Sequence, residues 1–143
     1  MMTRAFPLAG LLRLRHLEED QAAGHLAAAN SRLEESSVRR DRARTALGGS
    51  PTGATSIESL YAVAAARAST RGMLADLDAL GRRHESAQEE AQTLFDAARA
   101  QSMRMEKLAR RHQDSVAADE LHDEQIIIDE IAATSWHREE SSR

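Results

Sequence analysis

The sequence contains no cysteine among its 143 residues, and aromatic residues make up only 3% of it. Without cysteine the chain can form no disulfide and has no thiol nucleophile. Few aromatic side chains leave little apolar area for a thick globular core, whereas the pairing of two helices needs only a narrow apolar seam. With only two prolines in the chain, long stretches have no residue that interrupts a helix.

Further absences exclude whole classes of function. No apolar run approaches the roughly 18 residues that a membrane-spanning helix needs, and Arg13 and Arg15 interrupt the N-terminal leucines, so we expect no secretory signal. The formal net charge of −4 disfavours nonspecific nucleic-acid binding. There is no glycine-rich phosphate loop, no nucleophile elbow and no paired set of metal ligands. We therefore predict a non-enzymatic protein with no catalytic residue, no cofactor and no metal ion.

The residues that are present favour long helices, because alanine, leucine, glutamate and arginine dominate and 29% of the chain is charged. A first helix is predicted from about residue 7 to residue 47, with Pro7 in its first turn. Alternating steps of four and three residues, counted back from Leu47, give a seam that is apolar at two thirds of its positions. This seam comprises Leu8, Leu12, Arg15, Glu19, Ala22, Leu26, Ala29, Leu33, Ser36, Arg40, Ala43 and Leu47.

Glycine and proline between Gly48 and Gly53 predict the one strong break in the chain, a loop over residues 48–54. Thr55 and Glu58 have the spacing of a capping box, so a second helix is predicted over about 55–135, followed by a frayed tail over 136–143. The whole chain, 1–143, is expected to form a single coiled-coil domain. Charge pairs four residues apart, such as Asp78 with Arg82, are expected to support the helices weakly.

The second helix continues the heptad spacing. Its predicted seam comprises Leu74, Leu77, His84, Ala91, Phe95, Ala98, Met105 and Leu108, with a further cluster of Leu121, Ile128 and Ile131 after a slip in register near Val116. At about 1.5 Å per residue the two helices would be about 60 Å and 120 Å long. The predicted fold is therefore all-α, an antiparallel two-helix coiled coil in which the longer second helix either projects or breaks near Gly72. A lone glycine costs only about 1 kcal/mol in a helix, which favours projection.

Both ends of the chain carry more apolar surface than one helix–helix seam can cover. Leu8, Leu11, Leu12, Leu14 and Leu17 occupy well over half of the helix circumference, and the consecutive residues 126–128, all isoleucine, span about 200°. A hairpin directs both ends to the same side, although a projecting second helix would stagger them along the axis. We hypothesise that another protein covers this surface; the alternative is self-packing, by a third helical segment or a homodimer.

Three segments, in order, resemble the family of the flagellar export protein FliJ. The first is the opening stretch from Phe6 to Arg15 with Glu18, Glu19 and Ala22 after it; the second runs from Met105 to Arg111, and the third from Glu124 to Ala132. The resemblance implies an antiparallel two-helix coiled coil similar to the stalk subunit of rotary ATPases. It also implies a place in the flagellar type III export apparatus, at the cytoplasmic face of the inner membrane.

The partners that the resemblance implies are the hexameric export ATPase, the membrane protein of the export gate and substrate chaperones. Residues expected to enter the ATPase ring are Leu11, Leu12, Leu14, Ile126, Ile127 and Ile131. Near the helix turn, where the family presents aromatic residues to the gate, this chain has only Tyr61 among alanines. The alternatives are the equivalent stalk of a virulence secretion system and a homo-oligomeric coiled-coil scaffold.

Overall fold

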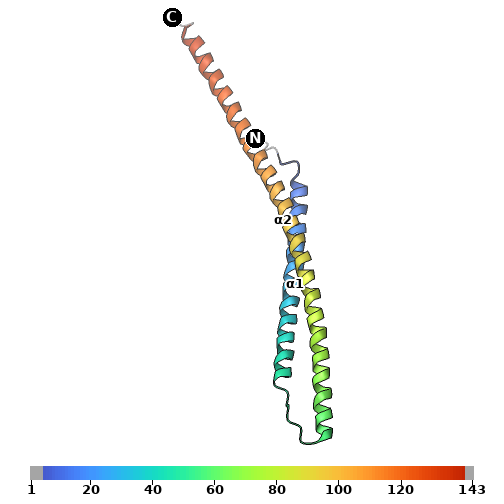
Figure 1. Cartoon of the computed structure of the whole chain (residues 1–143). Coiled ribbons are helices and arrows are strands. Elements are labelled where there is room, and N and C mark those ends of the chain that lie inside the picture. The colour runs from blue at the N-terminus through green and yellow to red at the C-terminus, as the bar shows by residue number, and fades with distance from the viewer. Residues whose placement is uncertain (1–4, 141–143) are drawn as a thin grey trace. The chain divides into compact units, whose positions relative to one another are not determined.

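A computed structural model describes residues 5–140, with side chains as far as Arg138. Two helices account for most of this part of the chain: α1 (Ala9–Gly48, 40 residues) and α2 (Ile57–Glu140, 84 residues), joined by a loop (Figure 1). Of the described residues, none lies in a β-strand. The predicted all-α fold of two packed helices, the second longer than the first, is confirmed.

The contacts within the chain divide it into two units. The loop unit comprises residues Glu18–Ala98, and in it the C-terminal part of α1 packs antiparallel to the first part of α2. The terminal unit comprises Met1–Leu17 and Arg99–Arg143. In that unit the first turns of α1 pack on α2, and every described side chain from Leu121 onward is exposed.

Helix α1 begins at Ala9, two residues after the expected start, because Pro7 and Leu8 form the preceding turn. The Leu8 carbonyl accepts the first helical hydrogen bond, from the Leu12 N–H at 2.9 Å. At the other end the Ser50 hydroxyl donates to the Ala46 carbonyl at 2.9 Å and so satisfies a group that the helix leaves open. None of the glycines in the described part of the chain has a positive φ, so α1 ends without a left-handed cap.

Helix α2 is capped one residue later than the sequence predicted. Ser56, not Thr55, is the capping residue: its hydroxyl accepts the Ser59 N–H at 3.1 Å, and the Ser59 hydroxyl accepts the Ser56 N–H at 2.9 Å. The predicted box of Thr55 with Glu58 is wrong because this reciprocal pair already satisfies the first N–H groups. The connecting loop accordingly covers residues 49–56.

Helix α2 runs through Gly72 without a break, and continues to Glu140 rather than ending near residue 135. The alternative of a helix break near Gly72 is therefore wrong, and the continuous form that the cost of one glycine favoured is confirmed. Of the expected frayed tail, residues 136–140 are helical, and residues 141–143 lie outside the described part.

In the loop unit, the seam follows the predicted heptad positions of α1. From Glu19 to Leu47, each predicted seam residue is shielded at least in part, with Ala29 and Ser36 buried. The partner positions on α2 alternate by three and four residues, and comprise Leu74, Leu77, Gly81, His84, Gln88, Ala91, Phe95 and Ala98. The heptad interpretation therefore places this seam correctly. It omitted Gly81, which has no side chain, and Gln88, which is polar, because neither adds to an apolar pattern.

In the terminal unit, the same alternation continues through Ser102, Met105, Ala109, His112 and Val116. The predicted seam residue Leu108 is wrong: it is 44% exposed, because the step after Met105 is four residues and places Ala109 against α1. The further seam cluster that was predicted after a slip in register near Val116 does not face α1 either. Its residues Leu121, Ile128 and Ile131 are all exposed.

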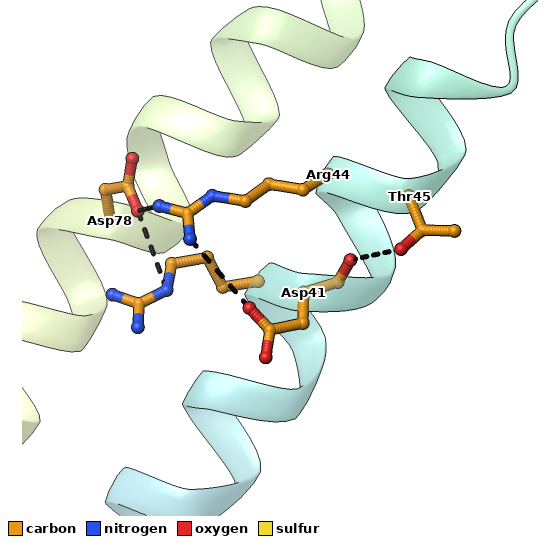
Figure 2. A network of polar contacts seen from close by, with 5 residues as sticks. Asp41, Arg44, Thr45 and Asp78 are labelled. Atoms are coloured by element: carbon orange, nitrogen blue, oxygen red, sulfur yellow. Dashed lines mark hydrogen bonds and ion pairs between the residues drawn. The ribbon is translucent and has the colours of Figure 1, made fainter.

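A polar network joins the helices in the loop unit (Figure 2). Asp78 of α2 lies 3.4 Å from Arg44 Nη2 and 3.8 Å from Arg40 Nε, both on α1, and Arg44 also lies 3.8 Å from Asp41. The Thr45 hydroxyl donates to the Asp41 carbonyl at 2.9 Å. Asp78 was expected to pair with Arg82 within its own helix; it instead reaches across to α1 and helps to set the register of the two helices.

Gly81 is buried where α2 packs against Ser36 and Arg40. The Ser36 hydroxyl and Arg40 Nε are buried and find no hydrogen-bond partner within the described residues. A Cβ at Gly81 would lie 3.5 Å from Arg40 Nη1 and 3.8 Å from Ser36 Oγ, which is ordinary van der Waals contact. An alanine therefore fits this position without displacing its neighbours.

Gly81→Ala should stabilise the protein by about 1 kcal/mol, because alanine is the better helix former and its methyl group fills the seam. Urea unfolding followed by circular dichroism measures the change. Gly72→Ala is the matched control: apart from its chain neighbours and the backbone of α2 itself, no atom lies within 4 Å of the Cβ that the substitution adds, so it reports helix propensity alone. A destabilised Gly81→Ala variant beside a stabilised Gly72→Ala variant would contradict the packing described here.

Candidate partner-binding surfaces

The first turns of α1, and Phe6 ahead of them, contact α2 in the terminal unit. The Ser102 hydroxyl, which is almost completely buried, donates to the Arg15 carbonyl at 3.0 Å. His16 Nε2 lies 2.9 Å from Glu106 Oε1. Ahead of the helix, the Phe6 ring packs against the His112 ring with centroids 5.6 Å apart. These contacts determine which leucines of α1 face α2 and which face outward.

The N-terminal leucines separate into two groups. Leu12 occupies the seam and is partly shielded. Leu8, Leu11, Leu14 and Leu17 are exposed, so the prediction of Leu8 as a seam residue is wrong: it precedes the first turn of α1. The structure thus leaves most of this apolar arc uncovered, as the width of the arc predicted. Of the three leucines expected to bind a partner, Leu11 and Leu14 are available on the surface and Leu12 contributes mainly to the seam.

The isoleucines lie on the part of α2 that no other described segment of the terminal unit covers. Ile126, Ile127 and Ile131 are each more than half exposed. The residue of α2 that lies beside the start of the leucines is His112, which the Phe6 ring contacts. Ile126 follows His112 by 14 residues, which corresponds to about 21 Å along the helix axis. The leucines and the isoleucines therefore do not form one compact patch. They are staggered along α2, as a projecting second helix requires.

The composition of α2 beyond Val116 explains why α1 has no seam to follow there. Continuing the spacing of the α1-facing residues past Val116 leads to Asp119, Asp123, Ile126 and Glu130. Carboxylates at three of these four positions would remain charged and hydrated, so they provide no apolar surface for a packed helix. The segment from Leu121 to Arg138 is called the extension. Most of its apolar residues therefore lie at positions that do not continue the α1-facing series, and they are exposed.

Charge changes sign along α2 in the terminal unit. A basic stretch of Arg99, Arg104, Lys107, Arg110 and Arg111 precedes the extension. It is followed by an acidic stretch of Asp114, Asp119, Glu120, Asp123, Glu124, Asp129 and Glu130. Charge segregated in this way favours partners, or orientations of a partner, that place opposite charges side by side.

A second exposed apolar group lies at the start of α2, in the loop unit. Tyr61 is 73% exposed, and Ile57 and Leu60 beside it are exposed as well. Sequence reasoning singled out Tyr61 alone. The two aliphatic residues could have been found from their position directly behind the cap, where α1 has already ended and has no residue to cover them.

Within residues 5–140 no group of three or more histidine, cysteine, aspartate or glutamate side chains is placed to hold a metal ion. No helix in this part of the chain is apolar over a length sufficient to cross a membrane. What the side chains do offer is exposed apolar and charged surface on two long helices.

These features define an all-helical, two-stranded coiled-coil protein with uncovered apolar ends. Comparison with protein families gives a match to the flagellar FliJ protein family over residues 4–141, and the chain belongs to that family. No curated protein and no solved structure matches the chain. The protein is thus a non-catalytic coiled-coil component of the flagellar export apparatus.

Proposed function

We propose that this chain is the stalk of the flagellar type III export apparatus, linking the hexameric export ATPase to the membrane protein of the export gate and to substrate chaperones. The observation that supports this most directly is the apolar surface of the terminal unit, where leucines of α1 and isoleucines of α2 stay exposed. Such surface is rarely left uncovered unless a partner protein binds it.

The end that enters the ATPase ring is the terminal unit, through the exposed residues Leu11, Leu14, Ile126, Ile127 and Ile131, with the partly shielded Leu12 behind them in the seam. The extension is a single helix with apolar residues on more than one side, and a ring of subunits surrounds a helix on all sides. One flat partner surface would use only a narrow stripe of it. The width of the apolar arc therefore favours a ring over a single groove.

The second proposed contact, with the export gate, is made by the start of α2 around Tyr61. An exposed aromatic ring beside Ile57 and Leu60 provides the large, rigid contact that interface centres favour. The protein would then work in the cytoplasm, held at the cytoplasmic face of the cell membrane through its partners. The chain would act as a single coiled-coil domain, which is supported by two helices that each run unbroken through both units.

The mechanism is mechanical and allosteric and needs no cofactor. A stalk changes the population of ring states only if it contacts those states differently, because a ligand shifts an equilibrium by its differential affinity alone. The staggered leucines and isoleucines would supply these contacts at two depths along the axis.

Replacing Ile126 and Ile127 by glutamate should weaken binding of the export ATPase about tenfold, because two apolar contacts are lost and two charges are brought to the interface. The stability of the isolated chain should not change, since both side chains are exposed. Retention of the ATPase on the immobilised chain measures the first effect, and urea unfolding measures the second.

The matched control replaces Gln125 and Ser135 by glutamate, which adds the same charge to the extension and leaves the isoleucines in place. This variant should retain the ATPase nearly as well as the unmodified chain. Unchanged ATPase binding by the isoleucine variant, together with a loss of its stability, would show that Ile126 and Ile127 support the fold and bind no partner.

A further inference from the structure

Helix α2 in the terminal unit carries a second heptad series, distinct from the residues that face α1. Its members alternate by three and four residues from Ala100 to Ile131, and every one of them is exposed. This outer stripe comprises Ala100, Met103, Lys107, Arg110, Asp114, Ala117, Leu121, Glu124, Ile128 and Ile131. An uninterrupted 3–4 alternation is the spacing by which one helix packs against another.

The chain's own α1 cannot cover this stripe. Met103 follows buried Ser102 by one residue and precedes buried Met105 by two. At 100° per residue, Met103 is therefore rotated by about 100° to 160° from the residues that α1 contacts. Both series lie on the same helix of the same unit. One face of α2 therefore contacts α1, and a second face has heptad spacing but is exposed.

The charges of the outer stripe show which helix fits. The positions near both ends of the outer stripe are apolar, with Met103 near one end and Ile128 near the other. Between them, Lys107 lies on the basic side and Glu124 on the acidic side. A second copy running antiparallel, with its two-fold axis between residues 115 and 116, places Met103 opposite Ile128 and Lys107 opposite Glu124.

The same alignment is favourable at the remaining positions. Arg110 lies opposite Leu121, whose side chain the aliphatic part of the arginine can cover. Asp114 lies opposite the small Ala117. Symmetry makes each of these pairs occur twice. A parallel second copy would instead place Lys107 against Lys107 and Glu124 against Glu124, which is repulsive.

We propose that the outer stripe is a self-association surface, through which two copies of this chain pair antiparallel along α2. The pairing is reversible and concentration-dependent, because charged residues occupy the middle of the stripe. It does not depend on the ATPase role proposed above, but it uses Ile131, which that role also uses. A paired chain and a chain bound to the ATPase are therefore mutually exclusive.

Sedimentation velocity of the full chain, over a concentration series spanning two orders of magnitude, tests the proposal. The unmodified chain should dimerise as its concentration rises. Lys107→Glu and Glu124→Lys should each weaken the dimer about tenfold, because each creates two like-charge pairs. The double variant, in which the charges are exchanged, should recover most of the affinity, since opposite charges again face each other.

Arg82→Glu and Glu85→Lys are the matched controls. They change the net charge by the same amounts at exposed positions of the loop unit and should leave the dimer unchanged. Circular dichroism verifies that each variant remains helical. A chain that stays monomeric throughout the series overturns the proposal and assigns the stripe to a different protein. A double variant no stronger than the single ones overturns the antiparallel pairing.

Discussion

A chain that ends at Val116 should lose about 100-fold in affinity for the export ATPase and keep its helix–helix seam. The deletion removes all of the exposed isoleucines of the terminal unit together with Trp136, and so takes away the larger part of the apolar surface that this unit presents. The N-terminal leucines remain, and Leu11 and Leu14 alone offer too little area for tight binding. Retention on the immobilised ATPase measures the loss.

The stability of the same truncated chain should change by less than about 0.5 kcal/mol, because Glu120 is the only described side chain of the deleted segment that is even partly shielded. A full-length chain in which the residues of 117–140 are shuffled keeps the composition and the charge, and serves as the control. It should bind as weakly as the truncated chain. If the truncated chain still bound the ATPase with full affinity, the extension would have no part in the interaction.

Met105→Ala should destabilise the protein by about 2 kcal/mol. Met105 is only 9% exposed where α2 meets the first turns of α1, and truncating a buried methionine costs its transfer free energy and leaves a cavity. The loss is a large fraction of the stability of a two-helix protein. Urea unfolding at low protein concentration, followed by circular dichroism, measures it.

Met103 provides the control for this substitution, since it is the same residue type two positions away and 56% exposed. Met103→Ala should change the stability by less than about 0.5 kcal/mol. It should instead weaken self-association, because Met103 belongs to the outer stripe. Equal destabilisation by the two variants would contradict the placement of the seam on α2.

Much of the fold could be predicted because it follows from repeating backbone geometry. The scarcity of proline predicted long helices, and steps of three and four residues predicted the seam of α1 from Leu12 to Leu47. Errors arose where a small residue occupies the seam. Ala109 and Gly81 are shielded because they occupy heptad positions that face α1, but such small residues add little to an apolar pattern. Leu108 is exposed because its position on the helix does not face α1.

The sequence predicted that apolar residues near the chain ends would be exposed, but it did not predict several individual contacts or the outer stripe. Three consecutive isoleucines cannot share one seam, so their exposure followed from the sequence. The capping of α2 by Ser56 and the cross-helix pairing of Asp78 did not, because each is a choice between nearly equal local partners. The outer stripe was not predicted for a different reason. The heptad pattern of α2 was assigned only to the seam with α1, so a second series on another face, which includes Met103, was not considered.

Trp136 gives this chain a natural optical reporter. It is the only tryptophan in the sequence, and it is 76% exposed on the extension. The fluorescence of an indole in water shifts to shorter wavelength when a protein surface closes around it. Excitation of this one side chain, in a sequence with a single tyrosine, therefore follows the covering of the extension in real time without any attached dye.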